Sequence, residues 1–140
     1  RGELVNVETQ FTRTLAALRK ICLSFPESSE KLAWGHPTFR AGKKIFVSLG
    51  IYDGAVCFGF KPDVETYRRL VDDPRCFVPP YVGHLGWLSM RVSGALKARE
   101  ARALCEQSYR QMALKRMLAA LDGEARAAGP TRRKRASRKP

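Results

Sequence analysis

The chain has 140 residues, a length that fits one domain and leaves little room for a second. Hydrophobic residues make up 44% of it and charged residues 28%, which is the usual balance of a globular protein. Its formal net charge of +13 favours nucleic acid or another polyanion as a partner, although such a charge also simply keeps a protein soluble. No stretch approaches the roughly 20 apolar residues of a membrane-spanning helix, and the first residues lack a secretory pattern. We therefore expect a cytoplasmic protein that does not bind membranes.

The first predicted element is a helix over residues 8–23. Its apolar side chains recur at helical spacing and form one stripe: Phe11, Leu15, Leu18 and Cys22. Pro26 and the serines after it end the helix. From residue 31 to 60 the sequence changes to short β-branched and aromatic runs separated by Gly and Asp-Gly turns. This pattern predicts four strands, at residues 31–34, 38–40, 44–49 and 55–60.

Pro62 and Asp63 stand where helices begin and predict a short helix up to residue 71. A loop rich in proline and glycine follows over residues 77–86, and then a strand over 87–92. A long helix starts near residue 96, and its core stripe is Ala101, Leu104, Cys105, Ser108 and Met112. Beyond Met112 the apolar positions are rotated by about 80–100°, at 100° per residue, so we expect the helix to bend or restart there.

The last part of this helix carries a further apolar set: Leu114, Met117, Leu118 and Leu121. We expect this set to pack on its own domain in a monomer, and the alternative is a homodimer through the C-terminal helix. Residues 129–140 contain six basic residues and no acidic one, which predicts a disordered basic tail after a folded domain of residues 1–128. Residues 1–129 still hold 20 basic and 13 acidic residues, a charge of +7.

The four cysteines are widely spaced, with no two closer than 19 positions: Cys22, Cys57, Cys76 and Cys105. Zinc sites usually contain at least one close pair of cysteine or histidine ligands, because a short loop presents both at once. We therefore expect no metal site and interpret the cysteines as reduced structural thiols of a cytosolic protein.

Alternation along the strands predicts two different sheet faces. One set is large and apolar and is expected to face the helices: Ile45, Val47, Leu49, Val56, Phe58, Phe60, Leu88, Met90 and Val92. The opposite set is small at its centre and mixes aromatic with basic residues: Lys44, Phe46, Ser48, Ala55, Cys57, Gly59, Lys61, Trp87, Ser89 and Arg91. Such an open face suits stacking on bases and pairing with phosphates. The alternative is a solvated face that the loop of residues 77–86 partly covers.

Several short motifs, in this order, resemble the MmcQ/YjbR family: LRKICLSFP at residues 18–26, WGHPTFR at 34–40, KIF at 44–46, FVPPYVGH at 77–84, GW at 86–87 and SYR at 108–110. The resemblance extends from about residue 11 to 121, and Leu114 stands where many relatives have proline. It implies a CyaY-like (frataxin-like) α+β fold, a two-layer sandwich with helices on one face of an antiparallel sheet. It also implies a bacterial source and the family's usual description as DNA-binding, which rests largely on fold and surface charge.

These observations lead to a prediction of weak nucleic-acid binding without strong sequence preference. The expected phosphate contacts are Arg40, Lys43, Lys44, Lys61 and Arg91. The expected stacking platforms are Phe46 and Trp87. The alternative is a small-molecule-binding or interaction domain whose pocket is formed by Trp34, His36, His84 and Trp87.

We do not expect an enzyme or a cofactor. A nucleophile and base would have to come from Cys57 or Ser89 beside the two histidines, and no nucleophile elbow, glycine-rich phosphate loop or carboxylate pair supports this. Iron binding, which a frataxin-like fold suggests, needs clustered carboxylates, whereas the first helix offers only Glu3 and Glu8 near its start.

Overall fold

The computed structural model describes residues 6–128. Its elements follow in this order: α1 (Val7–Cys22), β1 (Ser28–Ala33), β2 (His36–Ala41), β3 (Lys44–Tyr52), β4 (Ala55–Phe60), α2 (Val64–Leu70), β5 (Cys76–Phe77), a 3-10 turn η2 (Gly83–Leu85), β6 (Leu88–Arg91), α3 (Ala98–Met112) and α4 (Lys115–Ala128). All predicted helices and strands are present, within a few residues of their predicted ends. The two-residue β5 is an addition, because so short a strand leaves no alternation to detect.

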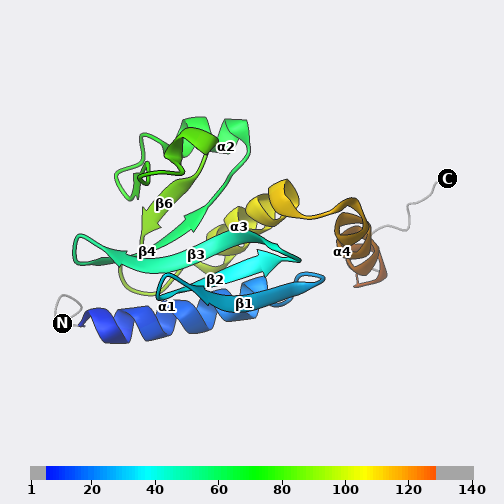
Figure 1. Cartoon of the computed structure of the whole chain (residues 1–140), viewed down its shortest axis with the longest axis horizontal. Coiled ribbons are helices and arrows are strands. Elements are labelled where there is room, and N and C mark those ends of the chain that lie inside the picture. Colours follow the sequence, from blue (N-terminus) through cyan, green and yellow to red (C-terminus); the bar gives the residue numbers. More distant parts are fainter. Residues whose placement is uncertain (1–5, 129–140) are drawn as a thin grey trace.

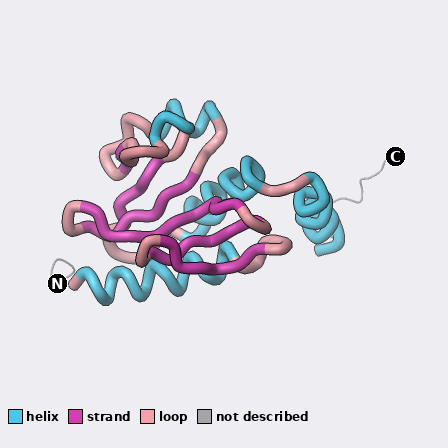
Figure 2. Tube along the Cα trace, in the orientation of Figure 1, coloured by secondary structure: helices cyan, strands magenta, loops and turns pink. Residues whose placement is uncertain are grey.

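One antiparallel sheet, in the order β1-β2-β3-β4-β6-β5, forms the first layer (Figure 1). Helices α1 and α3 contact each other and the central strands, and form the second layer. Figure 2 shows that α2 and the loop before β6 lie together beside the end of the sheet. The predicted α+β two-layer architecture is therefore confirmed. Helices α1 and α3 cover one face of the sheet and leave the opposite, open face uncovered by either of them.

Capping and amphipathic patterning explain where α1 forms. The Asn6 side chain accepts a hydrogen bond from the Thr9 N–H at 2.8 Å, which satisfies one of the free amide groups at the helix start. Leu18 and Cys22 are fully buried, and the earlier stripe residues Phe11 and Leu15 pack partly buried against the same core. All four cysteines are buried free thiols, as predicted.

An aromatic cluster joins α3 to the sheet. The rings of Phe25, Phe46 and Tyr109 lie 4.9–5.9 Å apart, centroid to centroid. The Tyr109 hydroxyl donates a hydrogen bond to the Pro26 carbonyl at 2.6 Å, and burial raises the pKa of Tyr109 to about 12. The Ser108 hydroxyl donates to the Phe46 carbonyl, so α3 also fixes the backbone of β3.

The prediction that Phe46 lies on the open face is wrong, and a β-bulge is the reason. Phe39 pairs with Val47, whereas the next residue, Arg40, pairs with Ile45, so Phe46 is the extra residue in β3. Phe46 and Val47 both have no exposed surface. Ile45, which the strict alternation placed in the core, turns to the open face instead. The other eight predicted core-facing residues are buried.

The long C-terminal helix is interrupted, as its shifted apolar stripe predicted. Ala113 has an extended backbone with ψ of 153°, and the chain continues as α4, which lies across the end of the molecule (Figure 1). Met117 and Leu121 are buried in the same domain, so these two side chains offer little to a second copy. The predicted basic tail lies outside the described residues.

Three segments meet at Glu27. Its carbonyl accepts a hydrogen bond from the Gly42 N–H in the β2–β3 turn at 3.0 Å, and its carboxylate pairs with Arg116 of α4 at 2.8 Å. The methyl group of Met117 lies directly over Gly42, because a Cβ built on that glycine would be 2.8 Å from it. The β2–β3 turn is therefore held by both the α1–β1 loop and α4.

Arg75 makes the stability of the fold depend on pH. Its guanidinium lies 2.9 Å from the Asp73 carboxylate and 2.8 Å from that of Glu100. Hydrogen bonds from its side chain and backbone N–H lower the pKa of Asp73 to about 2, and its side chain also lowers the pKa of Glu100. Both folded-state values lie below the ordinary ones, so this stabilisation is complete above about pH 4.5 and is lost as the pH falls toward 2.

We expect the melting temperature to decrease as the pH falls from 4.5 to 2. In the variant Arg75→Met this decrease is expected to be smaller, because the carboxyl groups of Asp73 and Glu100 return toward their ordinary pKa values. Thermal unfolding followed by circular dichroism at a series of pH values measures this. Parallel profiles for the two proteins would contradict the assignment.

Candidate functional site

The open face of the sheet has a flat floor of small side chains. The side chains of Thr38, Ser48 and Ser89 point away from α1 and α3, because their neighbours in each strand are core residues, and Gly59 lies between Ser48 and Ser89. At Gly59 an added Cβ would lie 2.8 Å from the Ser48 hydroxyl oxygen, so the floor leaves little space there for a larger residue. A floor of this kind leaves room above the sheet for a ligand.

A cavity of about 610 Å³ lies on this face. Four segments line it: the β1–β2 turn with the open side of β2, the β2–β3 hairpin with the start of β3, the loop before β6, and the last residue of α3. The lining residues are Ala33, Trp34, His36, Thr38, Arg40, Lys43, Lys44, Ile45, Ser48, Pro80, Val82, Trp87 and Met112. The structure thus brings together three predicted phosphate contacts and three of the four residues of the alternative pocket, Trp87 among them.

The lining combines cations with apolar groups and contains no acidic side chain. Within residues 6–128, no ion pair involves Arg40, Lys43 or Lys44. The Nε of Arg40 is buried and has no hydrogen-bond partner in the described part of the chain.

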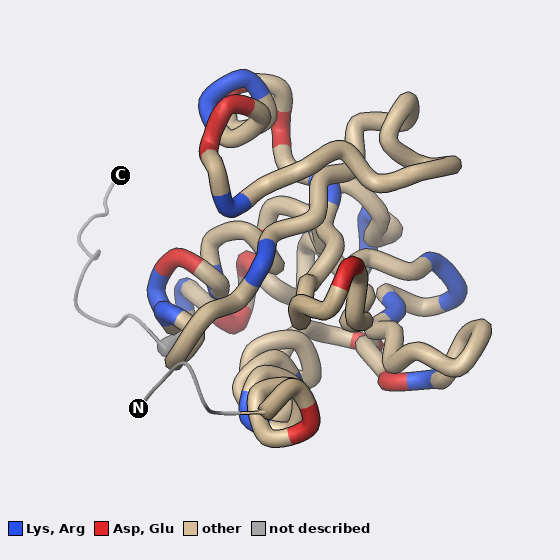
Figure 3. The backbone as a smooth tube through the Cα atoms, turned by 90° about the vertical axis from the view of Figure 1, so that its left-hand side faces the viewer, with Lys and Arg blue, Asp and Glu red and all other residues tan. Residues whose placement is uncertain are grey.

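Several acidic residues form ion pairs elsewhere in the fold. Figure 3 shows basic positions distributed around the fold with acidic positions between them. Glu30 pairs with Arg19 of α1 at 2.6 Å, and Arg110 of α3 pairs with both Glu106 and Asp122. These pairs belong to the helices and to the helix-facing side of β1. No carboxylate in the cavity lining therefore compensates the positive charge of the cavity.

Trp34 stands in the turn between β1 and β2 rather than at the end of a strand. Trp34 and Gly35 have φ values of 52° and 80°, the two positive values of a tight hairpin turn that usually contains Asn-Gly. A bulky side chain in this backbone region costs on the order of 1 kcal/mol. The Trp34 side chain is 90% exposed, so contacts within the domain do not offset that cost.

Four predicted site residues lie outside the cavity, and one of them, Phe46, is buried in the core. His84 and Lys61 line a second hollow of about 720 Å³ beside α2, together with Arg68, because the η2 turn directs residues 83–86 away from the cavity. Arg91 lies over the Phe77 ring at 4.7 Å and donates to the Pro74 carbonyl at 3.3 Å. The predicted pocket of four residues is thus divided, with His84 separated from the other three.

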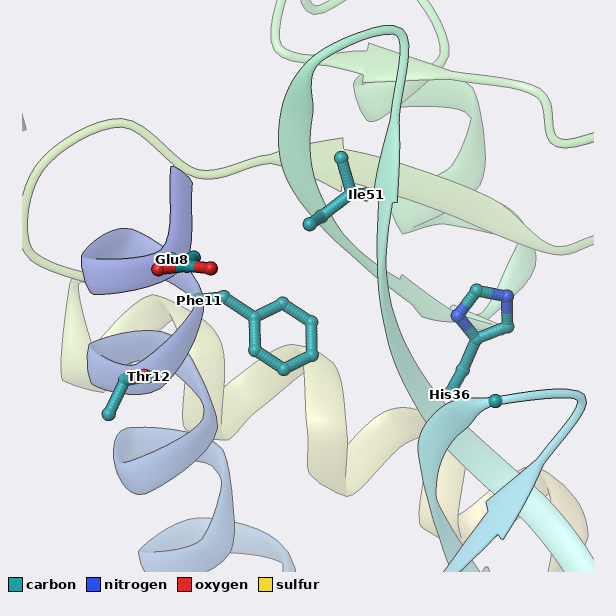
Figure 4. A pocket seen from close by; sticks show the side chains of 6 residues that line it. Glu8, Phe11, Thr12, His36 and Ile51 are labelled. Carbon is teal, nitrogen blue, oxygen red and sulfur yellow. The ribbon is translucent and has the colours of Figure 1, made fainter. Parts of the chain in front are cut away.

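A third hollow, of about 540 Å³, lies between the start of α1 and the end of β3. Phe11 points from α1 into the space bounded by Ile51 and His36, and Glu8 lies one turn away on the same helix (Figure 4). Its only fully charged lining residue is acidic, so it does not fit a polyanion. The described residues contain no group of three or more side chains that is able to hold a metal ion. They also contain no helix long and apolar enough to cross a bilayer.

The sequence did not identify six lining residues: Ala33, Thr38, Ile45, Pro80, Val82 and Met112. The bulge that turns Ile45 outward leaves no pattern in the sequence, because each of its residues is an ordinary strand former. Thr38 could have been found, since it alternates with the core residue Phe39 in β2. The loop and helix-end residues depend on tertiary packing.

Comparisons with known proteins agree with this fold. A family model described as YjbR matches residues 23–111. A crystal structure of a Pseudomonas syringae protein is similar, with a TM-score of 0.55 and 17% identity over 71% of this chain and 97% of that one. A Deinococcus radiodurans protein with a DUF419 domain has a TM-score of 0.61 and 19% identity over 79% and 86%. At these identities the likeness shows the fold alone. No curated protein matches the chain.

Proposed function

The chain belongs to the YjbR family, and we propose that it binds nucleic acid in the cavity on the open face of its sheet. One observation carries the proposal: Arg40, Lys43 and Lys44 meet Trp34 and Trp87 around a single cavity that no carboxylate lines. Cations pair with phosphates and aromatic rings stack on bases, so this combination fits both parts of a nucleotide. Because the backbone and ring faces are common to all nucleotides, the binding is weakly sequence-specific.

The chemistry of the site favours binding without catalysis. Cys57 is the thiol nearest the centre of the open face, and burial raises its pKa, which keeps the thiol protonated and unreactive. The cavity lining contains no carboxylate to act with His36 as an acid–base pair. Glu8, which lines the third hollow together with His36, lies across that hollow from it (Figure 4). We therefore propose a cytoplasmic, monomeric binding protein that uses no cofactor.

A small anionic ligand with an aromatic ring is the second candidate. The cavity volume of about 610 Å³ lies in the range of small-molecule sites, which span roughly 300–1,000 Å³. The same cations and tryptophans would contact such a ligand, so the two candidates differ in how affinity changes with ligand length.

Fluorescence anisotropy with labelled DNA at several salt concentrations tests the proposal, with the full chain compared with a chain truncated after residue 128. We expect the truncated domain to bind and the slope of log K against log salt to be about −2 to −3, since three lining cations each release about 0.7–0.9 counterions. Binding that disappears with residues 129–140 would assign it to the tail and reject the cavity.

A further inference from the structure

We propose that the cavity selects single-stranded nucleic acid and places two unpaired bases of one strand on Trp34 and on Trp87. This inference rests on the proposed function and specifies the form of nucleic acid. Three observations carry it: the exposure of Trp34 at a strained turn position, the separation of the two tryptophans along β2, and the shape and chemistry of the surface between them.

The exposure of Trp34 indicates that its ring contacts something outside the domain. The ring is 90% exposed at a position where the backbone has φ of 52° and where asparagine would fit without strain. A flat ring of this kind stacks on an unpaired base but has no access to the face of a base inside a duplex, where both faces are already stacked.

The strand register separates the two tryptophans. Trp34 precedes the start of β2. Trp87 adjoins Leu88, and the pairs Leu88–Phe60, Phe60–Val47 and Val47–Phe39 bring it level with the far end of β2. Along the strand direction, six residues of extended chain measure about 20 Å, and Trp87 also lies three strands away from β2 across the sheet. A stacked strand advances about 3.4 Å per nucleotide, so at least about six nucleotides are needed to reach both rings.

The surface between the two rings suits a strand and not a double helix. Its floor is made of small side chains such as Thr38 and Ser48, and the cations stand along the β2–β3 hairpin at one end. Helices α1 and α3, which would be long enough to enter a major groove, cover the opposite sheet face. Phosphates are therefore expected at the hairpin, with bases turned toward the floor and the two rings.

The intrinsic fluorescence of the full chain tests this directly, because Trp34 and Trp87 are its only two tryptophans and both line the cavity. The probes are thymidylate oligomers of two, six and twelve nucleotides and a blunt duplex of twelve base pairs. We expect the six-nucleotide oligomer to quench the fluorescence and to bind at least tenfold more tightly than either the two-nucleotide oligomer or the duplex.

The variant Trp34→Asn removes the ring but keeps the turn, since Asn-Gly is the preferred sequence there. We expect it to fold normally and to bind the six-nucleotide oligomer about tenfold more weakly. Tyr81→Asn is the matched control: Tyr81 is 92% exposed and has φ of 69°, yet it does not line the cavity. Its affinity is expected to stay within twofold of that of the unaltered protein.

Each other outcome overturns a different statement. Equal affinity and quenching for duplex and single strand would reject the single-strand inference and leave the proposed function standing. Equal affinity for two and six nucleotides would reject the two separated platforms and favour a small ligand. Binding without any tryptophan quenching, or an unchanged affinity of Trp34→Asn, would reject the cavity as the site and with it the inference.

Discussion

Replacing Phe46 by alanine is expected to lower the free energy of unfolding by about 3–5 kcal/mol, the usual cost of removing a fully buried aromatic side chain. The ring has no exposed surface and packs against both Phe25 and Tyr109, so its loss leaves a cavity at the contact between α3 and β3. The total free energy of unfolding of a small domain is only about 5–15 kcal/mol, so the variant loses a large part of its stability. Urea unfolding followed by circular dichroism measures the change.

The matched control is Ile45→Ala, in the neighbouring position of the same strand. Ile45 is half-buried and lines the open-face cavity, so Ile45→Ala is expected to lower the free energy of unfolding by clearly less than half as much as Phe46→Ala. Under strict alternation of β3 the ranking would be reversed, because Ile45 would face the core. A larger cost for Ile45→Ala would therefore contradict the bulge.

The double variant Lys43→Glu/Lys44→Glu is expected to weaken nucleic-acid binding by about tenfold to a hundredfold at 50 mM salt. Both lysines are exposed and belong to no ion pair in the described chain, so their reversal leaves the fold intact while it replaces two phosphate contacts by repulsion. The salt dependence is also expected to become shallower by about 1.4–2, because two counterion-releasing contacts are lost.

Lys20→Glu/Lys97→Glu is the control for the change in net charge. Lys20 lies in the last turn of α1 and Lys97 directly before α3, both exposed and both outside the cavity. The two double variants have the same total charge. If both weaken binding equally, the protein attracts nucleic acid through its overall field, and the hairpin is not the contact surface.

The fold was predictable from the sequence because its pattern is regular where helices and strands are long. The stripe of α1 and the alternation in β4 and β6 each placed core residues correctly. Phe46 and Ile45 were misplaced because a bulge shifts the alternation by one residue without any change in composition. His84 was misplaced because a single 3-10 turn decides which side of the loop it faces.

The candidate site was predictable only in part, for a related reason. The cations of the β2–β3 hairpin follow one another in the sequence, so their proximity is local. Trp34 and Trp87 are separated by 53 positions, and their approach to one cavity depends on the sheet order, which places β6 beside β4. Loop residues such as Val82 line the cavity through tertiary packing that no local pattern encodes.

The junction at Glu27 has a consequence for the thermodynamics of association. The turn that precedes Lys43 and Lys44 is fixed by the Gly42–Glu27 hydrogen bond and covered by Met117 of α4. Two long, flexible side chains therefore project from a backbone that is already ordered, and a ligand has only their rotamers left to immobilise. In the variant Arg116→Ala the turn would be less ordered before binding, and part of the entropy cost of ordering it would then fall on the binding step and weaken binding. Helix α4 therefore influences affinity although it contributes no cation to the cavity.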